Sequence, residues 1–378
     1  RSTPTSPPSN LSTSSIMKAT FIKTLALGLL AAVTLGLSAC KGDDTPNVPP
    51  TPSPSTSGEI ARVTIKLSMG HLHGKQDFHF VPSSGKYDLR NDIQEFTFVK
   101  NGDTWSLAPG APYSDLIAFQ LFAWDPKVYS SIAPDYGAVI ELYDAEGKLL
   151  NDQYTSEELR SQYQFFSYPT EATDFDGKPI AVNAADPTSI LRYVYCDTNV
   201  WNQSASKSPT DNAGKKLYYF LPETEPIGIK GYCQFPETGH FLLNIDLWHS
   251  PKGKLEGGKA SPFFAPNATV KSGKRLLHLT LPVNIAAQKR FMDEVIQGIL
   301  DDYSRRVREA EDKDKVQYQA VPLDQLTSPN GYFTDEEMRT FAKRMMKLLG
   351  TTDWDRVAMD FYRYYSSTGD EGSNKGYF

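Results

Sequence analysis

Apolar and polar residues alternate along most of the chain from Gly58 to about Leu281. Between Val63 and Met69 every second residue is apolar, which is the period of a strand with one buried face. Short aromatic-rich segments of the same kind follow, separated by Pro, Gly, Asn and Asp, as is typical of a two-sheet β fold. The predicted strands are 63–69, a hairpin over 95–107, 116–124, 138–143, 162–168, 190–195, 216–221, 227–235, 241–248 and 275–281.

The hairpin over 95–107 has the most specific sequence signal. Asn101-Gly102 favours the two positive φ angles of a type I′ turn. With these two residues at the turn, we expect Phe98 to lie opposite Trp105 on one face of the pair.

The pattern changes to a helical period after Pro282. Apolar residues recur every three or four positions over 292–307, which predicts an amphipathic helix. Thr334 and Glu337 form a capping box that begins a second helix, Gly350 ends it, and a third is expected over 353–365. The predicted fold is mainly β with a C-terminal α-helical segment: an antiparallel β-sandwich-like region over 58–282, then about three amphipathic helices within 283–378.

The N-terminal segment predicts export and lipidation. Residues 1–16 are interpreted as an upstream extension, and residues 17–39 have a basic start at Lys18 and Lys23 followed by a short apolar stretch, as in a signal peptide. This stretch ends in Leu37-Ser38-Ala39-Cys40, which resembles the lipobox of bacterial lipoproteins. The resemblance implies that Cys40 carries the lipid that anchors the protein to a membrane; the alternative is an ordinary signal peptide with an incidental cysteine.

Residues 40–57 form the predicted tether, because Pro, Ser and Thr dominate the run after the cysteine and leave it no core. Asp43 and Asp44 directly follow the lipobox region and resemble the export signal of lipidated surface proteins of the Bacteroidota. That resemblance implies an outer-membrane lipoprotein that faces the extracellular side. If the two aspartates only keep the tether soluble, the outward orientation no longer follows.

Two further cysteines, Cys196 and Cys233, form an even pair in a chain predicted to be exported. A disulfide between them is permitted in that compartment, and two buried thiols that never meet are a second possibility.

Three of the six histidines fall within nine residues, at His71, His73 and His79. A turn at Gly74-Lys75-Gln76 would bring His71 opposite His79, and three imidazoles in that arrangement could bind a transition-metal ion or give haem iron an axial ligand. The favoured interpretation is plainer: they are structural histidines of an unbroken strand.

Net charge and the absence of common catalytic motifs argue against some classes of function for this protein. The formal net charge is −6, and without the basic residues Arg1, Lys18 and Lys23 of the leader it is −9, which speaks against nucleic acid as a partner. The sequence contains no nucleophile elbow, P-loop, dinucleotide-binding glycine motif or zinc-protease helix, so catalysis is not expected, though these motifs do not cover every enzyme.

Residues 174–177 resemble the start of a Ca²⁺ loop, but a polar hairpin turn is the favoured interpretation.

We therefore expect a surface lipoprotein that binds a ligand, namely a metal ion, haem or a glycan, and that acts as an accessory to an outer-membrane transporter. Tethered lipoproteins often have that role, and the expectation rests on this analogy. The alternative is a structural or adhesive cell-surface lipoprotein with no small-molecule ligand, in which exposed apolar patches would mark a protein interface.

Overall fold

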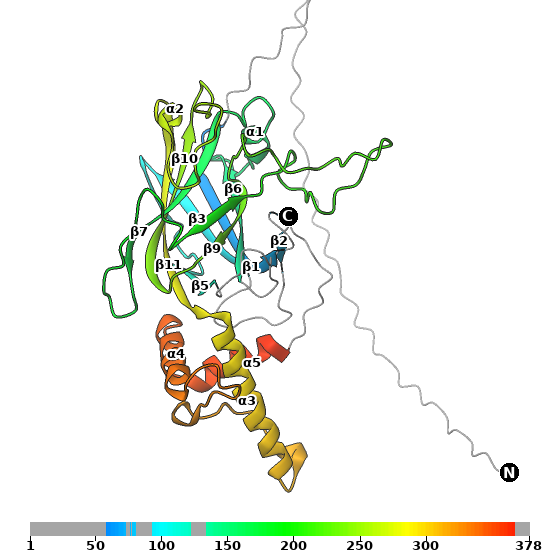
Figure 1. Ribbon diagram of the computed structural model, residues 1–378, viewed down its shortest axis with the longest axis vertical. Coiled ribbons are helices and arrows are strands. Elements are labelled where there is room, and N and C mark those ends of the chain that lie inside the picture. Colours follow the sequence, from blue (N-terminus) through cyan, green and yellow to red (C-terminus); the bar gives the residue numbers. More distant parts are fainter. Residues whose placement is uncertain (1–57, 73–75, 77, 81–92, 122–133, 367–378) are drawn as a thin grey trace, which may run out of the picture. The chain divides into compact units, whose positions relative to one another are not determined.

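The computed structural model describes residues 58–72, 76, 78–80, 93–121 and 134–366 (Figure 1). By its internal contacts the chain divides into residues 1–55 and 56–378, and every described residue belongs to the second unit. Cys40, the tether and His73 lie outside the described residues, so the predictions made for them remain predictions.

Two sheets make up the β region. The larger has the strand order β4-β3-β1-β6-β9-β8, with β2 paired to β1. The smaller has the order β5-β11-β10-β7, and all its pairs are antiparallel except β5 with β11. The strands are β1 (Arg62–Leu72), β2 (Phe78–Phe80), β3 (Ile93–Asn101), β4 (Thr104–Leu107), β5 (Leu116–Gln120), β6 (Asp135–Tyr143), β7 (Tyr163–Thr173), β8 (Arg192–Tyr195), β9 (Lys230–Gln234), β10 (Gly239–His249) and β11 (Lys274–Gln288). The mainly β, sandwich-like prediction is confirmed.

The two sheets share one hydrophobic core. Ile65 and Leu67 of β1 are buried in it together with Ile245 of β10 and Leu279 of β11. These positions alternate with polar ones along each strand, so each sheet turns one apolar face toward the other. Burial of these faces is the main free-energy term that holds the sheets together.

The 95–107 hairpin forms, but its predicted register is wrong. Phe98 lies opposite Leu107 and Lys100 opposite Trp105, because the two-residue loop is Gly102-Asp103. Gly102 has a φ of 61°, while Asn101 is not among the described residues with positive φ. A positive φ at the first loop residue alone is the pattern of a type II′ turn, which places glycine there. The pairing moves by two residues, so each side chain keeps its predicted face.

The strand predicted over 216–221 is also wrong. Isolated bridges join Thr198 to Phe220 and Thr210 to Lys216, and no ladder connects them in this described segment. The side chain of Asn199 donates to the carbonyl of Leu217 at 3.0 Å and accepts from the N–H of Tyr219 at 2.9 Å. An amide side chain has thus taken the backbone partners that a neighbouring strand would use.

Three turns share the sequence Asp-x-x-Gly-Lys, at 144–148, 174–178 and 211–215. In each, the first aspartate accepts a hydrogen bond from the lysine N–H, at 2.7–2.9 Å, and the glycine has a φ of 77–83°. The carboxylate and the glycine therefore close the same tight turn three times. The turn at 174–178 is the polar hairpin turn that the sequence favoured over a Ca²⁺ loop.

Cys196 and Cys233 are free, buried thiols, so the disulfide candidate is not found and the second possibility holds. Cys233 lies opposite Tyr193, whereas the N–H of Cys196 bonds to the carbonyl of Lys230, three residues away along β9. Three residues span about 10 Å along a strand, which is longer than the Cα–Cα distance that a disulfide can bridge. Side chains three residues apart also point to opposite faces of the sheet.

The C-terminal region contains the three predicted helices, α3 (Lys289–Glu309), α4 (Asp335–Leu348) and α5 (Trp354–Ser366). Short helices α1 (Asn151–Tyr154) and α2 (Ala268–Lys271) and 3₁₀ turns η1 (Lys313–Lys315) and η2 (Leu323–Gln325) complete the described elements. The capping box of Thr334 and Glu337 is present at the start of α4. A second core joins the helices through Val295, Phe341 and Val357. Within the described ranges, no helix combines the length and hydropathy that a membrane span requires.

Candidate functional site

The predicted histidine hairpin is formed by β1 and β2. His71 lies opposite His79 in this pair, as the sequence predicted from a turn between them. Phe78 fixes the hairpin because its ring is buried against Gly137 of β6, where an added Cβ would lie 2.5 Å from Phe78 Cε1. Gly137 therefore provides the space in which β2 packs.

The metal site itself remains a prediction. No cluster of three or more His, Cys, Asp or Glu side chains able to hold a metal occurs among the described residues, and His73 lies outside them.

A pocket of about 430 Å³ lies beside this hairpin, next to β8. Three aromatic rings line it: Tyr193 and Tyr195 meet edge to face at 5.3 Å between centroids, and Phe263 lies 6.3 Å from Tyr193. This volume suits a small organic ligand, and the ring faces suit a flat or apolar one. The remaining lining residues are Gln76, Val194, Asp197, Leu221, Pro222, Glu223, Pro226, Ala260, Ser261 and Pro262.

Gln76 connects the histidine hairpin to the pocket. It follows the first two histidines in sequence, lines the pocket, and donates from Nε2 to the carbonyl oxygen of Tyr195 at 3.0 Å. Gln76 is therefore the described residue that lies between the two histidine strands in sequence and at the pocket rim in space, and the described lining of the pocket includes neither His71 nor His79.

A buried carboxylate organises the pocket wall. Asp197 lies two residues after the end of β8 and accepts four backbone hydrogen bonds, from Ile227, Gly228, Ile229 and Lys230, at 2.7–3.1 Å. Burial raises the pKa of Asp197, although the N–H donors act to lower it. This one side chain fixes the segment that leads from Pro226 into β9.

A buried ammonium supports the same wall. Lys254 Nζ donates to the carbonyl oxygens of Arg160, Tyr163 and Pro226 at 2.6–3.1 Å. Burial lowers the pKa of Lys254 to about 7, against the attraction of Asp197 and Glu225, which acts to raise it. A buried lysine with a pKa of about 7 thus holds the backbone behind the pocket wall.

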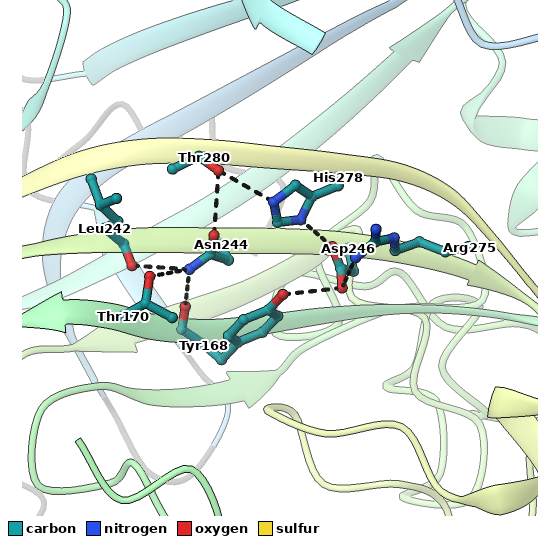
Figure 2. Close-up of polar contacts among 8 residues, drawn as sticks. All are labelled: Tyr168, Thr170, Leu242, Asn244, Asp246, Arg275, His278 and Thr280. Atoms are coloured by element: carbon teal, nitrogen blue, oxygen red, sulfur yellow. Dashed lines mark hydrogen bonds and ion pairs between the residues drawn. The ribbon is translucent and has the colours of Figure 1, made fainter. Parts of the chain in front are cut away.

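A separate polar network crosses the outer face of the smaller sheet (Figure 2). Asp246 accepts from His278 Nδ1 at 2.6 Å and from the Tyr168 hydroxyl at 3.3 Å, and Thr280 Oγ1 lies 3.4 Å from His278 Nε2. A hydroxyl, an imidazole and a carboxylate in this order resemble a hydrolase triad.

The same network also has a structural explanation. The Thr280 hydroxyl also donates to Asn244 Oδ1 at 3.3 Å, and Asn244 in turn donates to Thr170 Oγ1 at 2.8 Å. These bonds join β7, β10 and β11 across the sheet, as Figure 2 shows, so we interpret the network as a link between strands.

The other histidines have local partners. His249 stacks on Tyr163 at 4.5 Å, and His240 meets Phe175 edge to face at 4.8 Å. His240 lies within β10.

No protein-family model matches this chain, and no curated protein matches it significantly.

Sequence reasoning identified the histidines but missed the pocket beside them. Tyr193, Tyr195 and Asp197 appeared only as part of a strand and its end, and Phe263 lies in a loop. The one usable signal was Asp197, an acidic residue two positions after an aromatic strand, because a carboxylate at that place must find donors once it is buried.

Proposed function

We propose that this protein is a lipid-anchored outer-membrane surface protein that captures a small ligand in the aromatic pocket and delivers it to an outer-membrane transporter. The lipobox ending at Cys40, the tether over 40–57 and the acidic Asp43-Asp44 pair support the anchor and its outward orientation. Capture rests on the described site, and delivery rests on the role that tethered lipoproteins commonly have.

One observation carries the capture proposal: Gln76 joins the His71–His79 hairpin to an aromatic pocket of about 430 Å³. A sugar would use only the ring faces, and a bare metal ion would use only the imidazoles. Haem combines both chemistries, because its flat apolar ring suits the faces of Tyr193 and Phe263 and its iron suits an imidazole ligand such as the hairpin offers. Haem is therefore the ligand class that the site supports best.

Titration calorimetry of the purified protein with haemin, Zn²⁺ and a neutral oligosaccharide tests this proposal. We expect haemin to bind, and its affinity to fall in both Phe263→Ala and His71→Ala/His79→Ala. His278→Ala is the matched control, because this histidine lies in the separate network on the other sheet, and it should bind haemin like the parent.

The three titrations separate the ligand classes. Zn²⁺ binding lost only in the double histidine variant would indicate a metal-ion protein, and oligosaccharide binding lost only in Phe263→Ala would indicate a glycan protein. A parent that binds none of the three would refute ligand capture and favour the structural or adhesive alternative. Exposed apolar side chains at Val200, Leu217 and Tyr219 are the observation that favours that alternative.

A further inference from the structure

Residues 199–220, between β8 and β9, form an extended arm that leaves the sheets (Figure 1). Val200, Leu217 and Tyr219 of this arm are 38%, 46% and 43% exposed, and they are three of the seven exposed large apolar side chains in the described part of the chain. The arm has a defined shape, because Asn199 bonds to the backbone of Leu217 and Tyr219 across its base. Its apolar side chains are therefore displayed to solvent by a fixed backbone.

The arm also carries positive charge. Lys207 and Lys215 are exposed on it, and Lys216 donates from Nζ to the carbonyl of Ala205 at 2.9 Å. The one acidic residue of the arm, Asp211, accepts two backbone N–H groups of its own turn through Oδ1. A basic and aromatic segment is thus displayed by a chain whose formal net charge without its leader is −9.

The base of the arm lies beside the point where the predicted tether reaches the folded unit. Trp201 Nε1 donates to Asp152 of α1 at 2.8 Å, and the N–H of Gly58 donates to Gln153 of α1 at 3.2 Å. One helix of four residues therefore contacts both the arm and the first described residue. The seventeen residues between Cys40 and Gly58 span at most about 60 Å when extended. A lipid on Cys40 would hold the α1 side of the protein within that distance of the membrane.

From this geometry we propose that the arm docks on the membrane that holds the lipid anchor. Leu217, Tyr219 and Val200 enter the headgroup region, where aromatic and aliphatic side chains are stabilised, and Lys207 and Lys215 lie against anionic headgroups. Lipidation and the arm then form two attachments, and the second orients the protein on the surface. This inference rests on the lipid anchor of the proposed function.

Vesicle flotation tests the arm without the anchor. A Cys40→Ala chain that also lacks the apolar leader, residues 1–39, is mixed with vesicles of equal parts phosphatidylcholine and phosphatidylglycerol, and separately with vesicles of phosphatidylcholine alone. We expect it to float with the anionic vesicles. Leu217→Ser/Tyr219→Ser and Lys207→Glu/Lys215→Glu should each lower the ratio of bound to free protein roughly ten-fold or more.

Tyr332→Ser/Lys343→Glu is the matched control, because it removes an exposed aromatic and an exposed lysine from the helical region. It should float like the Cys40→Ala parent. An unchanged thermal unfolding midpoint in each variant confirms that the fold is intact.

Several results would overturn the docking proposal. It is wrong if the Cys40→Ala chain does not float with anionic vesicles, or if the arm variants float as well as that parent. It is also wrong if the arm variants keep vesicle binding but lose a chemical cross-link to an envelope protein in cells, because the partner is then a protein.

Two other measurements test the proposed function independently of the arm. Lipid labelling of Cys40 in cells tests the anchor, and haemin titration tests capture. The arm variants should take up both the lipid label and haemin like the parent.

Discussion

Replacing Asp197 by Asn removes the charge that holds the pocket wall while keeping the side chain's size. Each carboxylate oxygen of Asp197 accepts two backbone N–H groups: Oδ2 from Ile227 and Gly228, and Oδ1 from Ile229 and Lys230. An Asn amide has one oxygen, so its NH₂ group would face two of these donors. The substitution therefore leaves two buried N–H groups without an acceptor.

Each unsatisfied buried group costs about 1–3 kcal/mol, so the two together cost about 2–6 kcal/mol. The variant also avoids burying a negative charge, and the raised pKa of Asp197 shows that this burial opposes ionisation. An offset of about 1–2 kcal/mol reduces the expected loss of unfolding free energy to about 1–4 kcal/mol.

Urea unfolding of the purified protein, followed by Trp fluorescence, measures this loss. Asp211→Asn is the matched control, because Asp211 is exposed and bonds to two N–H groups through Oδ1 alone, which Asn can also do. That control should change the free energy of unfolding by no more than about 0.5 kcal/mol. The reasoning is refuted if Asp197→Asn loses less than about 1 kcal/mol, or no more than Asp211→Asn.

Other predictions concern pH, redox state and helix capping. Burial raises the pKa of Asp135 from 3.8 to about 7, so between these values the folded state binds more protons than the unfolded state and stability falls as pH rises. Over that window the parent should lose about 4 kcal/mol relative to Asp135→Asn, which urea unfolding at several pH values measures. Because Cys196 and Cys233 are free and burial raises the pKa of Cys233 to about 12, a thiol reagent should label both only after unfolding, and a reducing agent should leave the unfolding midpoint unchanged. Thr334→Ala removes the cap of α4 and should lower the free energy of unfolding by about 1 kcal/mol in the same urea assay; an unchanged value would contradict the capping-box assignment.

The sequence by itself determined the elements whose signal is local. The alternation over 63–69 sets which face of β1 is buried, and Thr334 with Glu337 sets where α4 begins. Such signals can be read from the chain because the residues that decide them lie within one strand or one helical turn. The position of His71 opposite His79 was only conditional in the sequence, which left an unbroken strand open, and the pairing of β1 with β2 decided it.

Only the tertiary structure decided features that depend on distant partners. Gly102-Asp103 forms the loop where Asn101-Gly102 was expected, because pairing of the whole strands sets the register. Asn199 replaced a strand partner at 217–219, and the separation of Cys196 from Cys233 follows from the alignment of β8 with β9.

The pocket is the clearest example of a feature that cannot be predicted from local sequence patterns. Its wall joins Gln76, Tyr195, Asp197 and Phe263 from segments far apart in sequence, and these meet only when both sheets have packed. No periodicity along the chain contains that information, because it depends on which apolar faces are buried against each other. The sequence thus determined which residues form strands and helices, whereas packing determined which of their side chains surround a ligand.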